Sequence, residues 1–186
     1  MVEVEIKYLA PSEGDFERQL GSLGAGFVTE RQESDRYFNA PDRDFRQTDE
    51  ALRIREVGSA VKLTYKGPKR DLLTKTRTEI EVPLVGEEGA AESMAQVLTS
   101  LGYRPVGSVR KSRRVYRLVL AEFTAEICLD SIAGLGAYVE LEIVVDEEQV
   151  DGAREALLRL AEKLGLSNPE RRSYLQLALS QGGADK

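Results

Sequence analysis

The chain has 186 residues, of which 41% are hydrophobic and 31% charged, a balance typical of one globular domain with a sizeable core. The net charge of −6 argues against nucleic-acid binding, and the single cysteine, Cys128, excludes an internal disulfide. Because the chain has no histidine, it has no Ser-His-Asp or Cys-His catalysis and no histidine-ligated zinc. Any metal would be held by oxygen, which favours Mg²⁺ or Mn²⁺.

The first half of the chain alternates strands with one helix. Residues 2–9 alternate apolar and charged side chains, which predicts a strand. A helix is expected to begin after Ser12 and to end at Gly24 and Gly26. Strands are predicted at about 27–38, 51–57, 60–67 and 74–84, with a hairpin turn at Gly58-Ser59 between the third and fourth.

The second half repeats this order. A helix is predicted at about 88–101, followed by strands at about 107–120, 122–131 and 137–146. Two further helices are expected at about 147–164 and 170–180. No linker divides the chain, so we expect one domain over residues 1–181 and a frayed tail over 182–186.

Several segments of the two halves resemble one another. Glu3-Val4-Glu5 recurs as Glu79-Ile80-Glu81, an offset of 76 (79−3), and Asp35-Arg36-Tyr37 resembles Arg114-Val115-Tyr116, an offset of 79 (116−37). The sequence therefore predicts an α+β fold. Two β-α-β-β-β halves close into an eight-stranded antiparallel β-barrel, with the helices packed outside.

Residues of like charge stand two apart on one face of most predicted strands. One interpretation is a sheet whose charged face meets water. Like charges repel on such a face, however, whereas a ligand of opposite charge between them would attract both. Carboxylate pairs suit a hard divalent cation and basic pairs suit phosphate oxygens. We therefore expect the charged face to turn inward and form a polar tunnel, with the aliphatic outer face covered by helices.

The chain resembles the CYTH family of triphosphate tunnel metalloenzymes in an ordered set of motifs from Glu3 to about Tyr174. They are Glu3-x-Glu5-x-Lys7, Arg53-x-Arg55, Lys62-x-Thr64-x-Lys66, Glu79-x-Glu81, Lys111-x-Arg113, Asp130 and Glu140-x-Glu142. The stretches Lys66-Gly67-Pro68, Leu101-Gly102-Tyr103, 129–136 and Arg172-Ser173-Tyr174-Leu175 look most like class IV adenylyl cyclases. The Gly-Leu-Gly and Ser-Tyr parts of these stretches also occur in thiamine-triphosphatase-like relatives.

The resemblance implies a role for each motif residue in an active tunnel enzyme. Lys62 is a possible general base, and Asp130 either orients a metal-bound water or braces Arg113, which we favour. The tyrosines, among them Tyr174, are expected to pack. The implied metal ligands are Glu3, Glu5, Glu79, Glu81, Glu140 and Glu142, and the implied triphosphate ligands are Lys7, Arg53, Arg55, Lys62, Lys66, Lys111 and Arg113.

These residues leave three functions open. The first is a class IV adenylyl cyclase that converts ATP to cyclic AMP and pyrophosphate. The second is a triphosphatase acting on inorganic, nucleoside or thiamine triphosphate, and the third is a non-catalytic polyphosphate- or nucleotide-binding module. No apolar run approaches the ~20 residues of a membrane span and the N-terminus lacks a signal-peptide pattern, so we expect a cytoplasmic protein without a membrane or nucleic-acid partner. A homodimer stays open.

Overall fold

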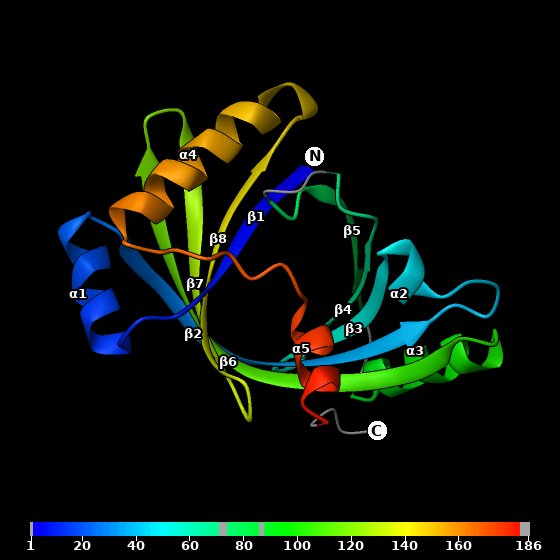
Figure 1. Cartoon of the computed structure of the whole chain (residues 1–186). Coiled ribbons are helices and arrows are strands. Elements are labelled where there is room, and N and C mark those ends of the chain that lie inside the picture. Colours follow the sequence, from blue (N-terminus) through cyan, green and yellow to red (C-terminus); the bar gives the residue numbers. More distant parts are fainter. Residues whose placement is uncertain (1, 71–73, 86–87, 183–186) are drawn as a thin grey trace.

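The computed structural model describes residues 2–70, 74–85 and 88–182. Eight antiparallel strands close into a barrel in the order β1-β5-β4-β3-β2-β6-β7-β8, which confirms the predicted fold class (Figure 1). The strands are β1 (Val2–Leu9), β2 (Gly26–Asn39), β3 (Ala51–Val57), β4 (Ala60–Lys66), β5 (Arg77–Leu84), β6 (Arg104–Leu120), β7 (Phe123–Ile132) and β8 (Gly136–Val145). The predicted tail lies almost wholly outside the described residues.

The strand order shows that the two halves are related by a two-fold arrangement. Equivalent strands pair with each other, β1 with β5 and β2 with β6, and the first strand of each half pairs with the last strand of the other. Val2 lies opposite Thr78, the residue equivalent to it by the offset of 76 (78−2). By the offset of 79, Gln32 is equivalent to Lys111 (111−32) and Glu33 to Ser112 (112−33). The two-fold relation therefore turns the pair Gln32↔Ser112 into the pair Glu33↔Lys111.

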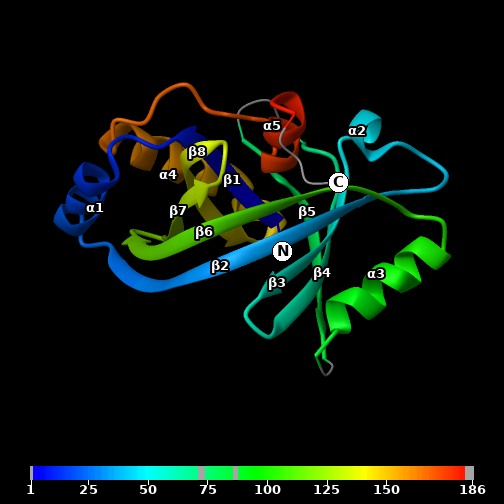
Figure 2. The ribbon, with the colours of Figure 1, turned by 90° about the horizontal axis from the view of Figure 1, so that it is seen from below.

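The helices cover the outside of the barrel. Helix α4 contacts β1, β7 and β8, and α3 lies across β3 and β4 (Figure 2). The short α2 was not predicted, and the C-terminal helix begins at Tyr174, later than expected, because the Ser173 side chain caps it together with Gln176. The helices are α1 (Glu13–Ser22), α2 (Phe45–Thr48), α3 (Ala90–Ser100), α4 (Val150–Lys163) and α5 (Tyr174–Ser180), with a 3₁₀ turn, η1 (Glu147–Gln149), before α4.

The hydrophobic core lies outside the barrel wall. Ile6 and Leu141 point outward from β1 and β8 and pack with Phe16 of α1 and Leu157 of α4. A second cluster places Ile54 of β3 with Leu98 of α3, among other residues. Because side chains alternate along a strand, burying these aliphatics under the helices sends the charged side chains into the barrel. No helix among the described residues is long and apolar enough to cross a membrane.

Candidate active site

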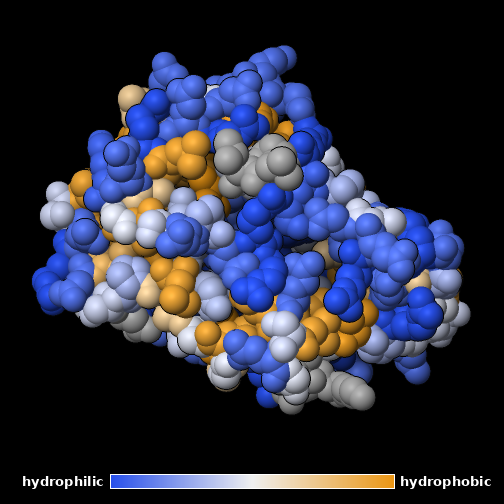
Figure 3. Space-filling view, in the orientation of Figure 1, coloured by the Kyte–Doolittle hydropathy of each residue, from blue (hydrophilic) through white to orange (hydrophobic). Residues whose placement is uncertain are grey.

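The barrel encloses a cavity of about 700 Å³ that is lined almost entirely by charged side chains. Figure 3 shows hydrophilic residues around a hollow at the centre of the face seen in Figure 1. Every strand contributes to the lining, and so does the start of α5 through Ser173 and Tyr174. All thirteen motif residues predicted to bind metal or triphosphate line this cavity: Glu3, Glu5, Lys7, Arg53, Arg55, Lys62, Lys66, Glu79, Glu81, Lys111, Arg113, Glu140 and Glu142.

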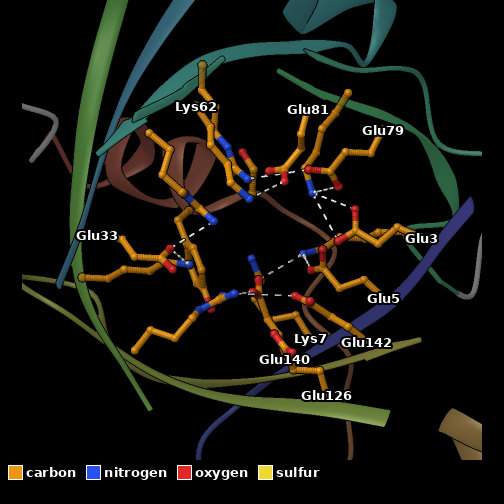
Figure 4. A pocket seen from close by; sticks show the side chains of 18 of the residues that line it. Glu3, Glu5, Lys7, Glu33, Lys62, Glu79, Glu81, Glu126, Glu140 and Glu142 are labelled. Carbon is orange, nitrogen blue, oxygen red and sulfur yellow. Dashed lines mark hydrogen bonds and ion pairs between the residues drawn. The ribbon is translucent and has the colours of Figure 1, made fainter. Parts of the chain in front are cut away.

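Three carboxylates converge on one wall of the cavity. Glu3 and Glu5 of β1 and Glu142 of β8 each offer an oxygen within 4.8 Å of the others, and Glu5 lies opposite Glu142 in the β1–β8 register (Figure 4). Among the described residues Glu142 accepts no hydrogen bond, and its ion pair with Arg113 is long, at 3.7 Å. Burial raises the pKa of Glu142 well above its usual range, and the nearby Glu3 carboxylate adds to the rise against the opposing effect of Arg113.

These three side chains fit a hard divalent cation. Carboxylate oxygens are the ligands that Mg²⁺ and Mn²⁺ prefer. Crowded carboxylates without enough donors are costly to bury, and a cation between them would remove that cost. Glu3, Glu5 and Glu142 would therefore hold the metal that the sequence motifs imply.

The other three predicted metal ligands are engaged by basic side chains. Glu79 lies 2.6 Å from the Lys66 ammonium, Glu81 lies 2.9 Å from that of Lys62, and Glu140 pairs with Arg113. Burial and a hydrogen bond with Glu3 raise the pKa of Glu79 to about 7, although Lys66 opposes the rise. The structure thus separates the six predicted carboxylates by position. Three converge, of which Glu3 and Glu5 are also ion-paired with Lys66 and Lys75, and the other three lie outside that cluster.

Several of the predicted phosphate-binding side chains are held by acids. Arg55 makes two hydrogen bonds of 2.7 Å to Asp35, and Arg53 lies 3.4 Å from the same carboxylate. Lys66 lies 2.8 Å from Glu3. Such pairs keep the basic side chains extended into the cavity, so a phosphate group can take over their hydrogen bonds with little rearrangement.

Lys7 is almost fully buried at the α5 end of the cavity. Its ammonium donates to the carbonyl oxygen of Arg172 at 2.5 Å and lies 4.0 Å from the centre of the Tyr174 ring. Burial and the nearby Lys75 lower its pKa well below the usual range, against the attraction of Glu140 and Glu5. Tyr174, which we expected only to pack, therefore also lines the site and orders a predicted ligand.

The two predicted catalytic residues occupy different surroundings. The Lys62 side chain is 48% exposed and pairs with Glu81. Asp130 is fully buried, and its carboxylate accepts hydrogen bonds from Arg113 at 2.6 and 2.5 Å, from Lys111 at 3.2 Å and from the Tyr174 hydroxyl at 2.8 Å. This geometry favours the bracing role for Asp130.

Several lining residues were missed by the sequence analysis. Arg31, Glu33 and Asp35 alternate along β2, and Glu33-x-Asp35 is a pair of like charges two apart, the same signal as in the motifs used above. Lys75 forms a like-charge pair with Arg77 within the predicted strand 74–84, but it lies before the observed start of β5, and only the fold shows its 2.5 Å contact with Glu5. Arg77 and Glu126 also line the cavity.

A closed antiparallel barrel with a charged interior defines a class of tunnel proteins, and the comparisons give its family. The CYTH domain model matches residues 1–174, and the chain belongs to this family.

Two curated relatives and one solved structure are similar over most of their length. The "Putative adenylate cyclase MJ0240" of Methanocaldococcus jannaschii is 39% identical and covers 95% of this chain and 98% of its own. "Adenylate cyclase CyaB" of Aeromonas hydrophila is 32% identical and covers 94% of this chain and 87% of its own. The structure of the PH1819 protein from Pyrococcus horikoshii OT3 has a TM-score of 0.83 and 38% identity, and covers 96% of this chain and 99% of its own.

Proposed function

We propose that this protein is a metal-dependent enzyme that acts on a triphosphate in its tunnel, and that it converts ATP to cyclic AMP and pyrophosphate. The observation that carries the proposal is the convergence of Glu3, Glu5 and Glu142 in the same cavity as the basic side chains of β3 and β6. A binding module needs only the bases, whereas phosphoryl transfer also needs a centre that neutralises charge. Two relatives that carry an adenylate cyclase name support the same reaction.

The chain's own residues would position the substrate. Arg53, Arg55 and Lys66 would hold phosphate oxygens from one side, and Lys111 and Arg113 from another. Asp130 keeps Arg113 and Lys111 in place, so the phosphate groups meet a fixed set of donors. A Mg²⁺ or Mn²⁺ held by the three carboxylates would neutralise phosphate charge and acidify the attacking hydroxyl group.

In the proposed reaction the ribose 3′ oxygen attacks the α-phosphorus atom. The bond from that phosphorus to the oxygen bridging to the β-phosphate breaks, and pyrophosphate leaves with the electron pair. The hydroxyl proton passes to solvent. The basic side chains stabilise the charge that builds up on the leaving group, which is the main demand of phosphoryl transfer.

One assay separates this reaction from its alternatives. Purified protein is incubated with ATP, inorganic triphosphate or thiamine triphosphate, each with Mg²⁺ and with Mn²⁺, and the products are resolved by chromatography. We expect cyclic AMP and pyrophosphate in equal amounts from ATP. Free phosphate without a cyclic product would instead establish a triphosphatase, and tight binding without any product would establish a binding module.

A pair of variants tests the metal assignment. Glu142→Gln should abolish turnover while the protein stays folded, because among the described residues the Glu142 carboxylate accepts no hydrogen bond whose loss would destabilise the barrel. Glu148→Gln, an exposed change in η1, is the matched control and should keep full activity. Full activity of Glu142→Gln would contradict the assignment.

A further inference from the structure

A second cavity adjoins the tunnel beside α5. This side pocket has a volume of about 480 Å³ and lies between α2, β3 and α5. It shares six lining residues with the tunnel: Tyr37, Arg53, Lys66, Lys75, Arg77 and Ser173. The two cavities therefore meet at these six side chains.

The lining of the side pocket differs from that of the tunnel. Phe45, Leu52, Val106, Leu175 and Leu179 give it an apolar wall. Its three carboxylates are already engaged: Asp44 by the Asn39 amide, Asp49 by Lys69, and Glu50 by Arg43. A volume in the range of small-molecule sites with an apolar wall suits an uncharged ring system, and no free carboxylate remains to attract a cationic one.

Arg77 stands at the junction of the two cavities. The residue is 8% exposed, its Nε atom is buried without a partner, and its guanidinium group makes no hydrogen bond or ion pair with any residue that the structure describes. Arg53, beside it in both cavities, also has a buried Nε atom without a partner. A buried cation without a hydrogen-bonding partner is costly, and an anionic ligand would remove the cost.

We propose, on the basis of the proposed function, that the side pocket binds the nucleoside of the substrate and that Arg77 binds the phosphate group next to it. The triphosphate then lies in the tunnel with its esterified end at the junction, where Arg77 and Arg53 have hydrogen-bonding capacity to spare. The substrate class is a triphosphate esterified to an uncharged, ring-bearing organic group. Inorganic triphosphate would leave the side pocket empty, and thiamine triphosphate would bring a cation into it.

Calorimetry in EDTA tests this assignment, because binding is then measured without turnover. Burying roughly 100 Å² of an apolar ring should make ATP bind about tenfold or more tightly than inorganic triphosphate or thiamine triphosphate. Leu179→Trp, an exposed change that narrows the side pocket, should remove this preference while affinity for inorganic triphosphate stays the same. Leu158→Trp on α4, away from both cavities, is the matched control and should keep the preference.

Arg77→Gln should weaken ATP binding by roughly 10- to 100-fold, the loss of a charged hydrogen bond, and Arg77→Lys should restore part of it. Replacing an arginine that makes structural hydrogen bonds would lower the melting temperature of the ligand-free protein. Arg77 makes none with the described residues and acts on Glu3 and Asp49 only through its charge, so its replacement should change that temperature by less than about 2 °C. A lower melting temperature with unchanged ATP affinity would overturn the role of Arg77. Unchanged ATP preference in Leu179→Trp would overturn that of the side pocket.

The same data keep this inference apart from the proposed reaction. Selective ATP binding without cyclic AMP formation would refute the cyclase and leave the side pocket standing. Cyclic AMP formation with no effect of either variant on ATP affinity would do the reverse.

Discussion

Replacing Asp130 by asparagine removes the acidic centre of a buried network. In the folded protein this carboxylate makes two hydrogen bonds to Arg113 and one each to Lys111 and Tyr174. Removing one partner of a buried ion pair usually costs about 3–5 kcal/mol because the other charge is left without compensation. Arg113 keeps Glu140, and Lys111 keeps Glu33, so we expect the lower end, about 3 kcal/mol.

Thermal unfolding of the ligand-free protein measures this loss. For a chain of this length, about 3 kcal/mol corresponds to a fall in melting temperature of roughly 6–12 °C. Glu126→Gln, on the same face of β7 but only partly buried, is the matched control and should shift the midpoint by less than about 2 °C. An unchanged melting temperature in Asp130→Asn, combined with lost turnover and intact triphosphate affinity, would refute the bracing role and indicate that Asp130 acts on the reacting groups.

Three further predictions concern acid stability, the tunnel rim and the metal. Burial would raise the pKa of Glu33, but Lys111, Arg113 and Arg55 outweigh it and lower this pKa to about 2. The ionised Glu33 side chain therefore contributes about 3 kcal/mol to the free energy of unfolding above about pH 4.5, and this contribution is lost as the pH falls towards 2. In denaturant unfolding, the stability gap between the protein and Glu33→Gln should narrow over that window; a constant gap would contradict the ion pairs. Lys62→Ala should lower the free energy of unfolding by less than about 1 kcal/mol, because the ion pair with Glu81 is about half exposed. It should raise KM more than it lowers kcat, whereas a loss of kcat with unchanged KM would support Lys62 as the general base. Mg²⁺ or Mn²⁺ should raise the melting temperature of the protein but not that of Glu142→Gln, and an equal rise in both would place the metal elsewhere.

The sequence predicted the barrel because two independent patterns agreed. The alternation along each strand located the strands, and the repeated segments with offsets of 76 and 79 indicated two similar halves that close into one barrel. Which strands pair, as at Val2↔Thr78 and Glu33↔Lys111, came only from the structure. Element ends were less accurate. The C-terminal helix begins at Tyr174, directly after the capping residue Ser173, rather than near Pro169, because a side-chain hydrogen bond and not the proline fixes its start.

Only those site residues that belong to an alternating pattern of charged side chains on a strand could be predicted from the sequence. Motif residues line the cavity as expected, but their partners come from distant segments. Lys75 reaches Glu5 from a loop, and Tyr174 reaches Asp130 across 44 positions of sequence. The difference between the converging Glu142 and the ion-paired Glu140 also depends on geometry, since both belong to one Glu-x-Glu motif.

Each half of the barrel pairs its first strand with the last strand of the other half, and this pairing has a consequence for folding. β1 cannot complete its pairing until β8 has been made, because Val2 pairs with Val145 and Leu9 with Tyr138. Contacts this far apart in the sequence slow folding, since the entropy of loop closure is lost before the pairing energy is gained. During synthesis on the ribosome, β1 therefore cannot complete its pairing until most of the chain, including β8, has been made. We expect barrel closure to limit the refolding rate, and the unpaired β1 edge to be the part of the nascent chain most exposed to aggregation.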